Sequence, residues 1–218
     1  MSATTLASFI PLLADSNGLC CLRNHEDVAL LEAVFCPDFA GPAASAPFAS
    51  AALGPGWRLA LLSSFIGAGA VAGALPAGAV ASLDACLAEA EAAGEAVLVA
   101  LHHPPLPPAG DVPPWAGNCL LQPEALLAVL GARRAARVLL YGHLHADVSA
   151  RLGAACDAYC TPSTCTQTLP ASPLGWVKDA EASPGFRTLS LLPGGEHQTR
   201  VHRVDVAACK VDADAAAQ

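Results

Sequence analysis

Five of the seven histidines follow directly after apolar segments, where a buried strand or helix would end. His102 and His103 are adjacent, and a single residue separates the two histidines of Gly142-His143-Leu144-His145. Neutral imidazole is the commonest protein ligand of transition metals. In an extended backbone, the period of two would place His143 and His145 on one side of the chain. The pattern indicates metal binding, although an HxH pattern alone is weak evidence and His102-His103 before two prolines also fits a rigid turn.

Two short apolar segments must position these histidines. Val97–Leu101 (VLVAL) stops at His102, and Arg137–Tyr141 (RVLLY) stops at Gly142, so both are predicted to be buried strands. In layered α/β proteins, ligands bind beyond strand ends, where loops hold side chains on a rigid base. By contrast, His197 and His202 lie between charged and polar residues near the C-terminus, and we expect surface or structural roles for them.

The rest of the chain alternates helices and strands early and contains mostly strands late. Helical spacing of apolar residues, with proline in the first turn and glycine after the last, predicts helices. We expect helices over residues 27–35, 75–93 and 122–130. We expect further strands over 57–62, 186–192 and 199–206, with a hairpin turn at 193–195 between the last two. Residues 41–56 are expected to form a loop. This order predicts an α/β fold of layered sheets with outer helices, forming one domain over residues 1–206 before a flexible tail at 207–218.

Composition limits the function. With 54% hydrophobic and 14% charged residues among 218, the chain can bury a sizeable core. A net charge of -8 argues against a nucleic-acid partner, which needs clustered Lys and Arg. Glycines and serines interrupt the longest apolar segment, Leu59–Val80, and the first residues show no export signal, so we expect a cytoplasmic protein with no membrane partner. The nine cysteines form no CxxC pair and are expected to be reduced.

The motifs taken together are more specific than any one of them. Asn24-His25-Glu26, then His102-His103-Pro104, then Gly142-His143-Leu144-His145 follow in that order. The chain resembles the calcineurin-like metallophosphoesterase superfamily, and within it the bacterial 3′,5′-cyclic nucleotide (cAMP) phosphodiesterase branch. The resemblance covers residues 20–206. Further segments that carry it are residues 56–64, 67–73, 161–165, 184–187 and 201–203.

The resemblance implies a four-layer αββα sandwich that binds two metal ions, typically iron, manganese or zinc, and hydrolyses phosphodiesters. It implies that Asn24, His102 and His143 bind one metal and that His145 belongs to the other. It assigns His25 a catalytic, phosphate-binding role as a donor to the phosphate or the leaving oxygen, and Asn24 would lie beside the same phosphate. His103 would lie next to the site. From the residues alone, Asn24-His25 also fits a helix cap before Asp27.

The chain departs from the family at its N-terminal end. The family's Asp-x-His and Gly-Asp-x-x-Asp motifs are absent, Arg23 replaces a glycine, and Ser63-Ser64 stand where an acidic residue is frequent. We therefore expect an N-terminally truncated chain that lacks one or more strands, binds one metal ion or fewer, and hydrolyses its substrate poorly.

Three functions stay open from the sequence. The first is a cyclic AMP phosphodiesterase with a misplaced start. It would act on a small phosphoester, and the resemblance allows a homodimer because family members often form dimers. The second is a non-catalytic binding domain. The third is a metallophosphoesterase with another phosphoester substrate. The absent carboxylate motifs favour the second, and the extent of the resemblance favours the first.

Overall fold

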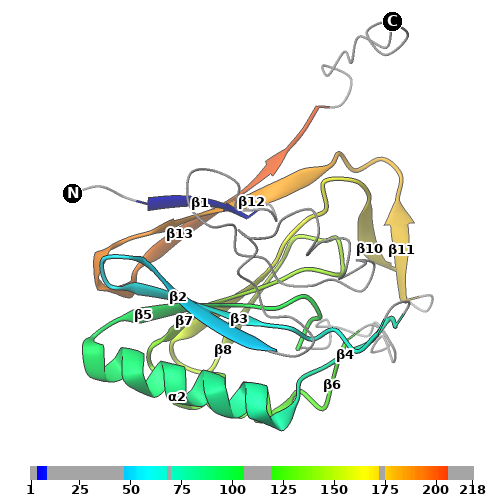
Figure 1. Ribbon diagram of the computed structural model, residues 1–218. Helices are drawn as coiled ribbons and strands as arrows, with labels where there is room; N and C mark the ends of the chain where they lie inside the picture. The colour runs from blue at the N-terminus through cyan, green and yellow to red at the C-terminus, as the bar shows by residue number, and fades with distance from the viewer. Residues whose placement is uncertain (1–3, 9–46, 68–69, 106–118, 172–174, 206–218) are drawn as a thin grey trace, which may run out of the picture.

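The structure is a computed structural model that describes residues 4–8, 47–67, 70–105, 119–171 and 175–205. Its centre is a six-stranded sheet with strand order β2-β3-β5-β7-β9-β8 (Figure 1). Strands β3, β5, β7 and β9 run parallel, and the outer strands β2 and β8 are antiparallel to their neighbours. The bounds are β2 (Phe48–Gly54), β3 (Trp57–Leu62), β5 (Ala96–Ala100), β7 (Ala136–Tyr141), β8 (Val148–Leu152) and β9 (Cys156–Cys160).

A smaller antiparallel sheet lies across one face of the large one (Figure 1). It has the order β1-β12-β13, with bounds β1 (Thr4–Ser8), β12 (Gly185–Leu191) and β13 (His197–Arg203). The short 3-10 helix η1 (Pro193–Gly195) joins its last two strands, at the predicted hairpin turn. Two further pairs are β4 (Gly73–Ala74) with β6 (Leu120–Leu121) and β10 (Gln167–Ala171) with β11 (Gly175–Asp179).

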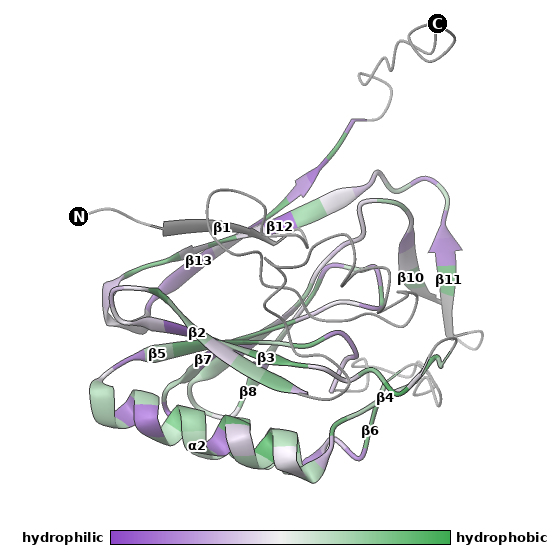
Figure 2. Cartoon of the chain, in the orientation of Figure 1, coloured by the Kyte–Doolittle hydropathy of each residue, from purple (hydrophilic) through white to green (hydrophobic). Residues whose placement is uncertain are grey.

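Two helices cover the other face of the large sheet, α2 (Ala77–Ala93) and α3 (Glu124–Ala132). In α2 the buried residues Ala79, Leu83, Cys86, Leu87 and Ala90 recur at helical spacing, which gives the helix one apolar face. Figure 2 shows hydrophobic and hydrophilic residues alternating along α2 and mostly hydrophobic residues on the central strands. Pro76 precedes the helix, and Gly94 ends it in the left-handed conformation at φ 69°.

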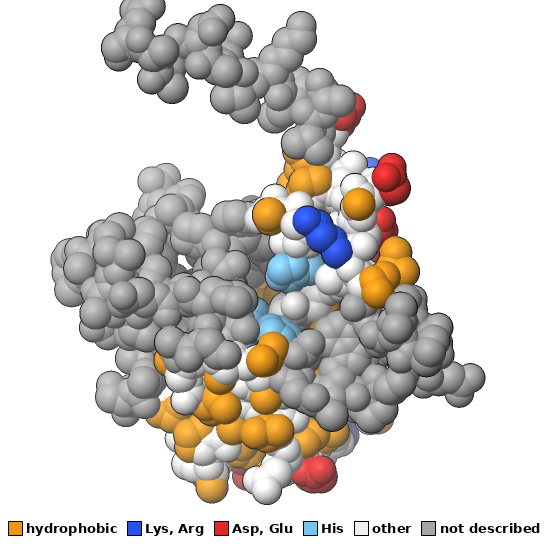
Figure 3. All heavy atoms as spheres, turned by 90° about the vertical axis from the view of Figure 1, so that its right-hand side faces the viewer, with side chains coloured by type: hydrophobic (Ala, Val, Ile, Leu, Met, Phe, Trp, Pro, Cys, Tyr) orange, Lys and Arg blue, Asp and Glu red, His pale blue; other side chains and the backbone are white. Residues whose placement is uncertain are grey.

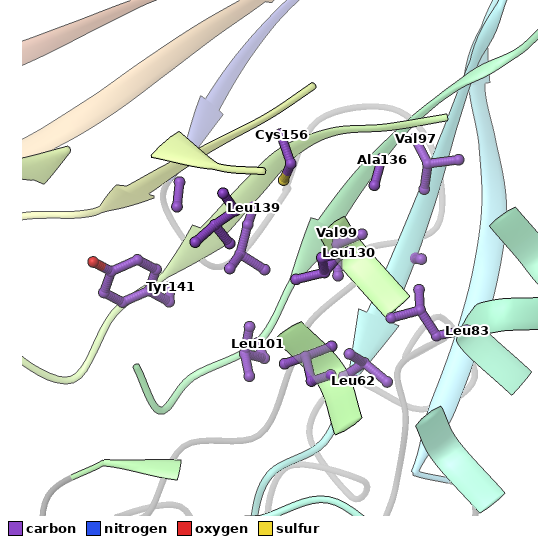
Figure 4. Packing of buried hydrophobic residues seen from close by; sticks show 14 of the residues in the cluster. Leu62, Leu83, Val97, Val99, Leu101, Leu130, Ala136, Leu139, Tyr141 and Cys156 are labelled. Atoms are coloured by element: carbon purple, nitrogen blue, oxygen red, sulfur yellow. The ribbon is translucent and has the colours of Figure 1, made fainter. Parts of the chain in front are cut away.

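The large sheet therefore has a core on each face. Between the sheet and the helices, Leu62, Leu83, Val99 and Leu130 pack together with Leu139 (Figure 4). Between the two sheets, Trp57, Leu59 and Leu98 pack against Leu189 and Leu191 of β12. The predicted α/β fold of layered sheets is confirmed. The described residues form three layers, helices, large sheet and small sheet, and the fourth layer of the predicted sandwich is not among them.

The elements that position the histidines lie where the sequence predicts them. The strand over 57–62 is predicted to the residue. The observed bounds of β5, β7, β12, β13, α2 and α3 differ from the predicted ones by a few residues, whereas β1, β4, β6 and β8 to β11 were not predicted. The loop expected over 41–56 is wrong for Phe48–Gly54, which forms β2. Its small residues have little strand propensity alone, but the turn at Pro55-Gly56, with φ 76° at Gly56, brings them alongside β3. The helix expected over 27–35 and the tail at 207–218 lie outside the described residues.

None of the helices in the described ranges has the length and apolar character to cross a membrane. Among the cysteines that the structure describes, Cys86, Cys119, Cys156, Cys160 and Cys165 are free thiols.

Candidate metal centre

The two histidine-bearing loops start at the carboxyl ends of neighbouring parallel strands. β5 ends at Ala100 and β7 at Tyr141, and Ala100 pairs with Leu140 in the parallel register. The Gly142 amide donates a hydrogen bond to the His102 carbonyl at 3.1 Å, which ties the two loops together. The chain therefore delivers His102 and His143, 41 positions apart in sequence, to one edge of the sheet. Figure 3 looks onto the right-hand side of Figure 1, and histidine side chains are visible near the middle of this face.

Three imidazoles meet at this edge. His143 Nδ1 lies 3.0 Å from His102 Nε2. The ring of His103 completes the group, with all three pairs of ring centroids 4.8–4.9 Å apart. One ring nitrogen from each of the three residues lies within 4.8 Å of the others, an arrangement that can hold a metal ion. We call His102, His103 and His143 the histidine cluster.

His103 is the most deeply placed member of the histidine cluster, with 1% of its surface exposed. Its Nδ1 forms a hydrogen bond with Ser64 Oγ at 2.8 Å, and its backbone amide donates to the same oxygen at 3.3 Å. Burial, with a smaller effect from His143, lowers the pKa of His103 to about 4, so the ring is neutral at physiological pH. Its buried Nε2 has no hydrogen-bond partner among the described residues. In the tautomer whose Nδ1–H donates to Ser64 Oγ, Nε2 presents a lone pair that a transition metal can bind.

Gly73 makes room for this ring. A Cβ at position 73 would lie 2.1 Å from His103 Nδ1 and 2.7 Å from the Ser64 carbonyl oxygen, so only glycine fits. β4, which contains Gly73, is held by its pairing with β6 and by a hydrogen bond from the Gly73 amide to the Cys119 carbonyl at 3.2 Å. Ser64 and Gly73 thus fix His103 from two sides, and neither was predicted as a site residue.

No protein-family model matches the chain. The 3′,5′-cyclic adenosine monophosphate phosphodiesterase CpdA of Pseudomonas aeruginosa is 37% identical over 162 residues, which cover 73% of this chain and 56% of that protein. A probable cyclic nucleotide phosphodiesterase of Synechococcus sp. (strain WH7803) is 36% identical over 151 residues, covering 67% of this chain and 54% of the relative. The chain is homologous to these phosphodiesterases over about two thirds to three quarters of its length. The resemblance inferred from the histidine motifs is confirmed.

The chain spans about half the length of the curated relatives it matches. A 3′,5′-cyclic-nucleotide phosphodiesterase of Nostoc sp. (strain PCC 7120) is 32% identical over 114 residues, covering 49% of this chain and 38% of the relative. Among solved structures, a dimetal phosphatase from Danio rerio covers 70% of this chain and 59% of its own, with a TM-score of 0.46 and 14% identity.

The structure brings together some of the residues that the metallophosphoesterase motifs select. His102 and His143 lie in the histidine cluster, and His103, expected beside the site, has its ring within it. His145 is not a member, and its Nδ1 lies 3.4 Å from Thr166 Oγ1. Asn24 and His25 lie outside the described residues, so their predicted roles stay predictions.

The extended backbone expected for the GHLH segment is wrong. His143 and His145 have φ angles of 66° and 50°, in the left-handed region. The Leu144 amide donates to the Gly142 carbonyl at 2.7 Å, which closes a tight turn. Leu144 is 2% exposed and belongs to the core beneath the large sheet, so its burial favours the turn over an extended strand.

The remaining described histidines make contacts within the fold. His197 Nε2 lies 3.0 Å from the Tyr159 hydroxyl, and Asp157 lies 3.5 Å away. The His202 ring stacks on Phe186 and its Nε2 lies 3.0 Å from Thr188 Oγ1.

Proposed function

We propose that this chain carries the histidine portion of a metal-dependent phosphodiester hydrolase whose substrate is 3′,5′-cyclic AMP. The observation that carries the proposal is the histidine cluster at two adjacent strand ends, in a homologue of cyclic nucleotide phosphodiesterases. Phosphodiesterase activity appears in the names of the relatives. The cluster supports the same activity for this chain, because such hydrolysis requires metal ligands in a fixed arrangement.

The donor set fits a divalent transition metal such as zinc, manganese or iron. His102 and His143 each offer a ring nitrogen, and His103 is neutral and adjacent. We propose that Asn24 joins His102 and His143 on one metal ion, and that His145 contributes to a second ion if one is bound. Bound metal ions would polarise the phosphate ester and activate the attacking water.

Charge supports a phosphate substrate. Neutral imidazoles add no negative charge, so a divalent ion held by them keeps its full positive charge toward an anionic phosphodiester. The protein as a whole is acidic, with a net charge of -8, so local cations must provide the attraction. We propose that His25 donates a hydrogen bond to the phosphate or the leaving oxygen, in the role that its motif implies.

We further propose that this chain alone hydrolyses its substrate slowly. No Asp or Glu joins the histidine cluster among the described residues, and metal sites for phosphodiester hydrolysis normally use carboxylates to hold and bridge two ions. The same observation favours the second candidate function, a metal-binding domain without turnover.

Metal content and turnover together test the proposal. We expect one equivalent or fewer of tightly bound zinc or manganese, and slow hydrolysis of bis(p-nitrophenyl) phosphate with added manganese. His143→Ala should abolish both, whereas His202→Ala, a histidine outside the cluster, should change neither. Metal binding without measurable turnover would identify the binding-domain alternative, and an absence of metal binding would refute both candidates.

Substrate class needs a second experiment. Cyclic AMP and p-nitrophenyl phosphate should be compared in a chimera that adds the N-terminal region of the Pseudomonas aeruginosa relative. Preference for cyclic AMP supports the proposed substrate, and preference for the monoester supports a metallophosphoesterase of other specificity.

A further inference from the structure

We infer that Arg187 is a positioning residue that holds the turn of residues 142–147 in the conformation that presents His143 to the histidine cluster. The expected effect of Arg187 on metal affinity rests on the proposed function. Its effect on the conformation of the turn does not, and is tested separately.

The turn has a conformation that its own sequence does not favour. His143 and His145 both have positive φ, at 66° and 50°. This region is uncommon for residues other than glycine, and it persists where the surrounding structure imposes it. Some contact outside the turn must therefore hold it.

Several contacts reach the turn from other strands. The Thr168 amide of β10 donates to the His145 carbonyl at 3.1 Å, and the Thr168 hydroxyl donates to the Leu144 carbonyl. The Cys160 thiol of β9 donates to the Gly142 carbonyl at 3.4 Å. The ionic contact is made by Arg187 of β12, whose Nη2 lies 2.5 Å from Asp147 Oδ1, two residues beyond His145.

Arg187 is bound on several sides. Its side chain is 3% exposed. Nη2 also donates to the Cys160 carbonyl at 3.2 Å, and Nη1 donates to Thr199 Oγ1 at 2.9 Å. The guanidinium carbon lies 4.9 Å from the centroid of the Tyr159 ring. The guanidinium thus joins the turn to β9 and to β13, the neighbour of its own strand β12, and a cation with this many fixed partners has little freedom to move.

The position of Arg187 on β12 is one that an apolar residue would normally occupy. Arg187 alternates with Leu189 and Leu191 on the face of β12 that packs against the large sheet. A buried ion pair is often no more stabilising than an apolar side chain of similar size, because desolvation offsets its attraction. A charge at this position is therefore explained better by the orientation of Asp147 and its turn than by stability.

A second arginine–aspartate pair provides a matched control. Arg151 Nη1 lies 2.6 Å from Asp157 Oδ1, at nearly the same distance, but Arg151 is 55% exposed and its partner lies on β9, away from the turn. The two pairs differ in the exposure of the arginine, and only the pair of Arg187 with Asp147 involves the turn.

The test compares Arg187→Met and Asp147→Asn with Arg151→Met. Zinc affinity is measured by competition with a chelating dye, and urea unfolding verifies that each variant is folded. We expect Arg187→Met and Asp147→Asn to weaken zinc binding by about 10-fold or more, as loss of a contact that orients a ligand does. Arg151→Met should stay within about twofold of the parent, because exposed pairs contribute little. Parent-like affinity in both turn variants would overturn the inference, and if Arg187→Met does not fold, Asp147→Asn decides alone.

A second readout needs no metal. Backbone couplings and carbon shifts in the NMR spectrum of the metal-free protein report positive φ at His143 and His145. We expect this signature to be lost in Arg187→Met and kept in Arg151→Met. If the parent protein binds no zinc, the proposed function fails, and the couplings still decide whether Arg187 holds the turn: unchanged couplings in Arg187→Met would refute it.

Discussion

The two edges of the large sheet are built from opposite kinds of side chain. At the carboxyl edge, β5 and β7 end in the histidine cluster, and its most buried member, His103, is neutral. At the amino edge, charged residues pair: Arg58 Nη2 lies 2.8 Å from Glu95 Oε2, and Arg133 Nε lies 2.7 Å from Asp84 Oδ1. A pocket of about 530 Å³ also lies at this edge, and Glu91, Glu95, Arg134 and Arg137 contribute to its lining.

The two edges differ in whether their polar side chains have hydrogen-bond partners. At the amino edge each of these acids has a donor, and Glu91 Oε1 accepts hydrogen bonds from the Arg134 and Ala135 amides at 2.6 and 3.2 Å. At the carboxyl edge His103 Nε2 has no partner among the described residues. Satisfied pairs stabilise a fold, whereas a buried donor or acceptor without a partner costs free energy unless a ligand completes it. The unpartnered nitrogen at the carboxyl edge supports the metal site that we propose there.

The largest expected effect separates the edges by metal binding. His102→Ala removes one member of the histidine cluster and should weaken zinc binding by at least about 100-fold, more than the loss of an outer partner. Arg133→Met, at the amino edge, should leave the affinity unchanged. Isothermal titration of both variants measures this. If the two variants bound zinc equally, the metal would lie elsewhere and the contrast between the edges would be lost.

Gly73→Ala should produce the next largest effect. Its Cβ would lie 2.1 Å from His103 Nδ1, so the ring must move within a packed site, and we expect a loss of about 2 kcal/mol in the free energy of unfolding. Gly78→Ala is the matched control, because no atom lies within 4 Å of its added Cβ and alanine favours the helix by up to about 1 kcal/mol. Urea unfolding compares them. Equal midpoints would show that His103 has free space and is not held by Gly73.

Much of the fold could be predicted because hydrophobic pattern fixes buried strands. The segments before His102 and Gly142 are apolar and short, so the strands and the histidines at their ends were evident from sequence. β2 was missed because its alanines and glycine gain their strand conformation from pairing with β3, which is a tertiary effect.

The surroundings of the histidines were less predictable than the histidines themselves. The contact of Ser64 and Gly73 with His103 joins segments about 30 to 40 positions apart, and no spacing within one segment encodes it. The left-handed turn at His143 and His145 was missed for a related reason. We infer that its conformation depends on the burial of Leu144 and on the contact of Arg187 with Asp147. The HxH pattern alone favours a strand.

Ser64→Ala tests whether the carboxyl edge depends on the hydrogen bond between Ser64 and His103. The change leaves buried Nδ1 without its partner at 2.8 Å, and we expect a loss of about 1–2 kcal/mol in the free energy of unfolding. Ser63→Ala is a neighbouring control of the same chemistry. Ser63 Oγ is buried and has no hydrogen-bond partner within the described ranges, so its removal should be neutral or slightly stabilising. Thermal unfolding distinguishes the two serines, and an equal loss in both would mean that the Ser64 hydroxyl does not support His103.

The smallest expected effect is a pH dependence of the amino edge. Hydrogen bonds from Arg133 lower the pKa of the Asp84 carboxyl below its ordinary value. Because the folded-state pKa is depressed, the pair stabilises the protein above the unfolded pKa of about 4, and this stabilisation is lost as pH falls through the folded-state value. Asp84→Asn should therefore lower the urea midpoint slightly at pH 7 and have no effect at a pH well below 4. The exposed position of this pair keeps the difference small. A difference that persisted in acid would assign the effect to packing of Asp84, and the amino edge would then owe its stability to something other than paired charge.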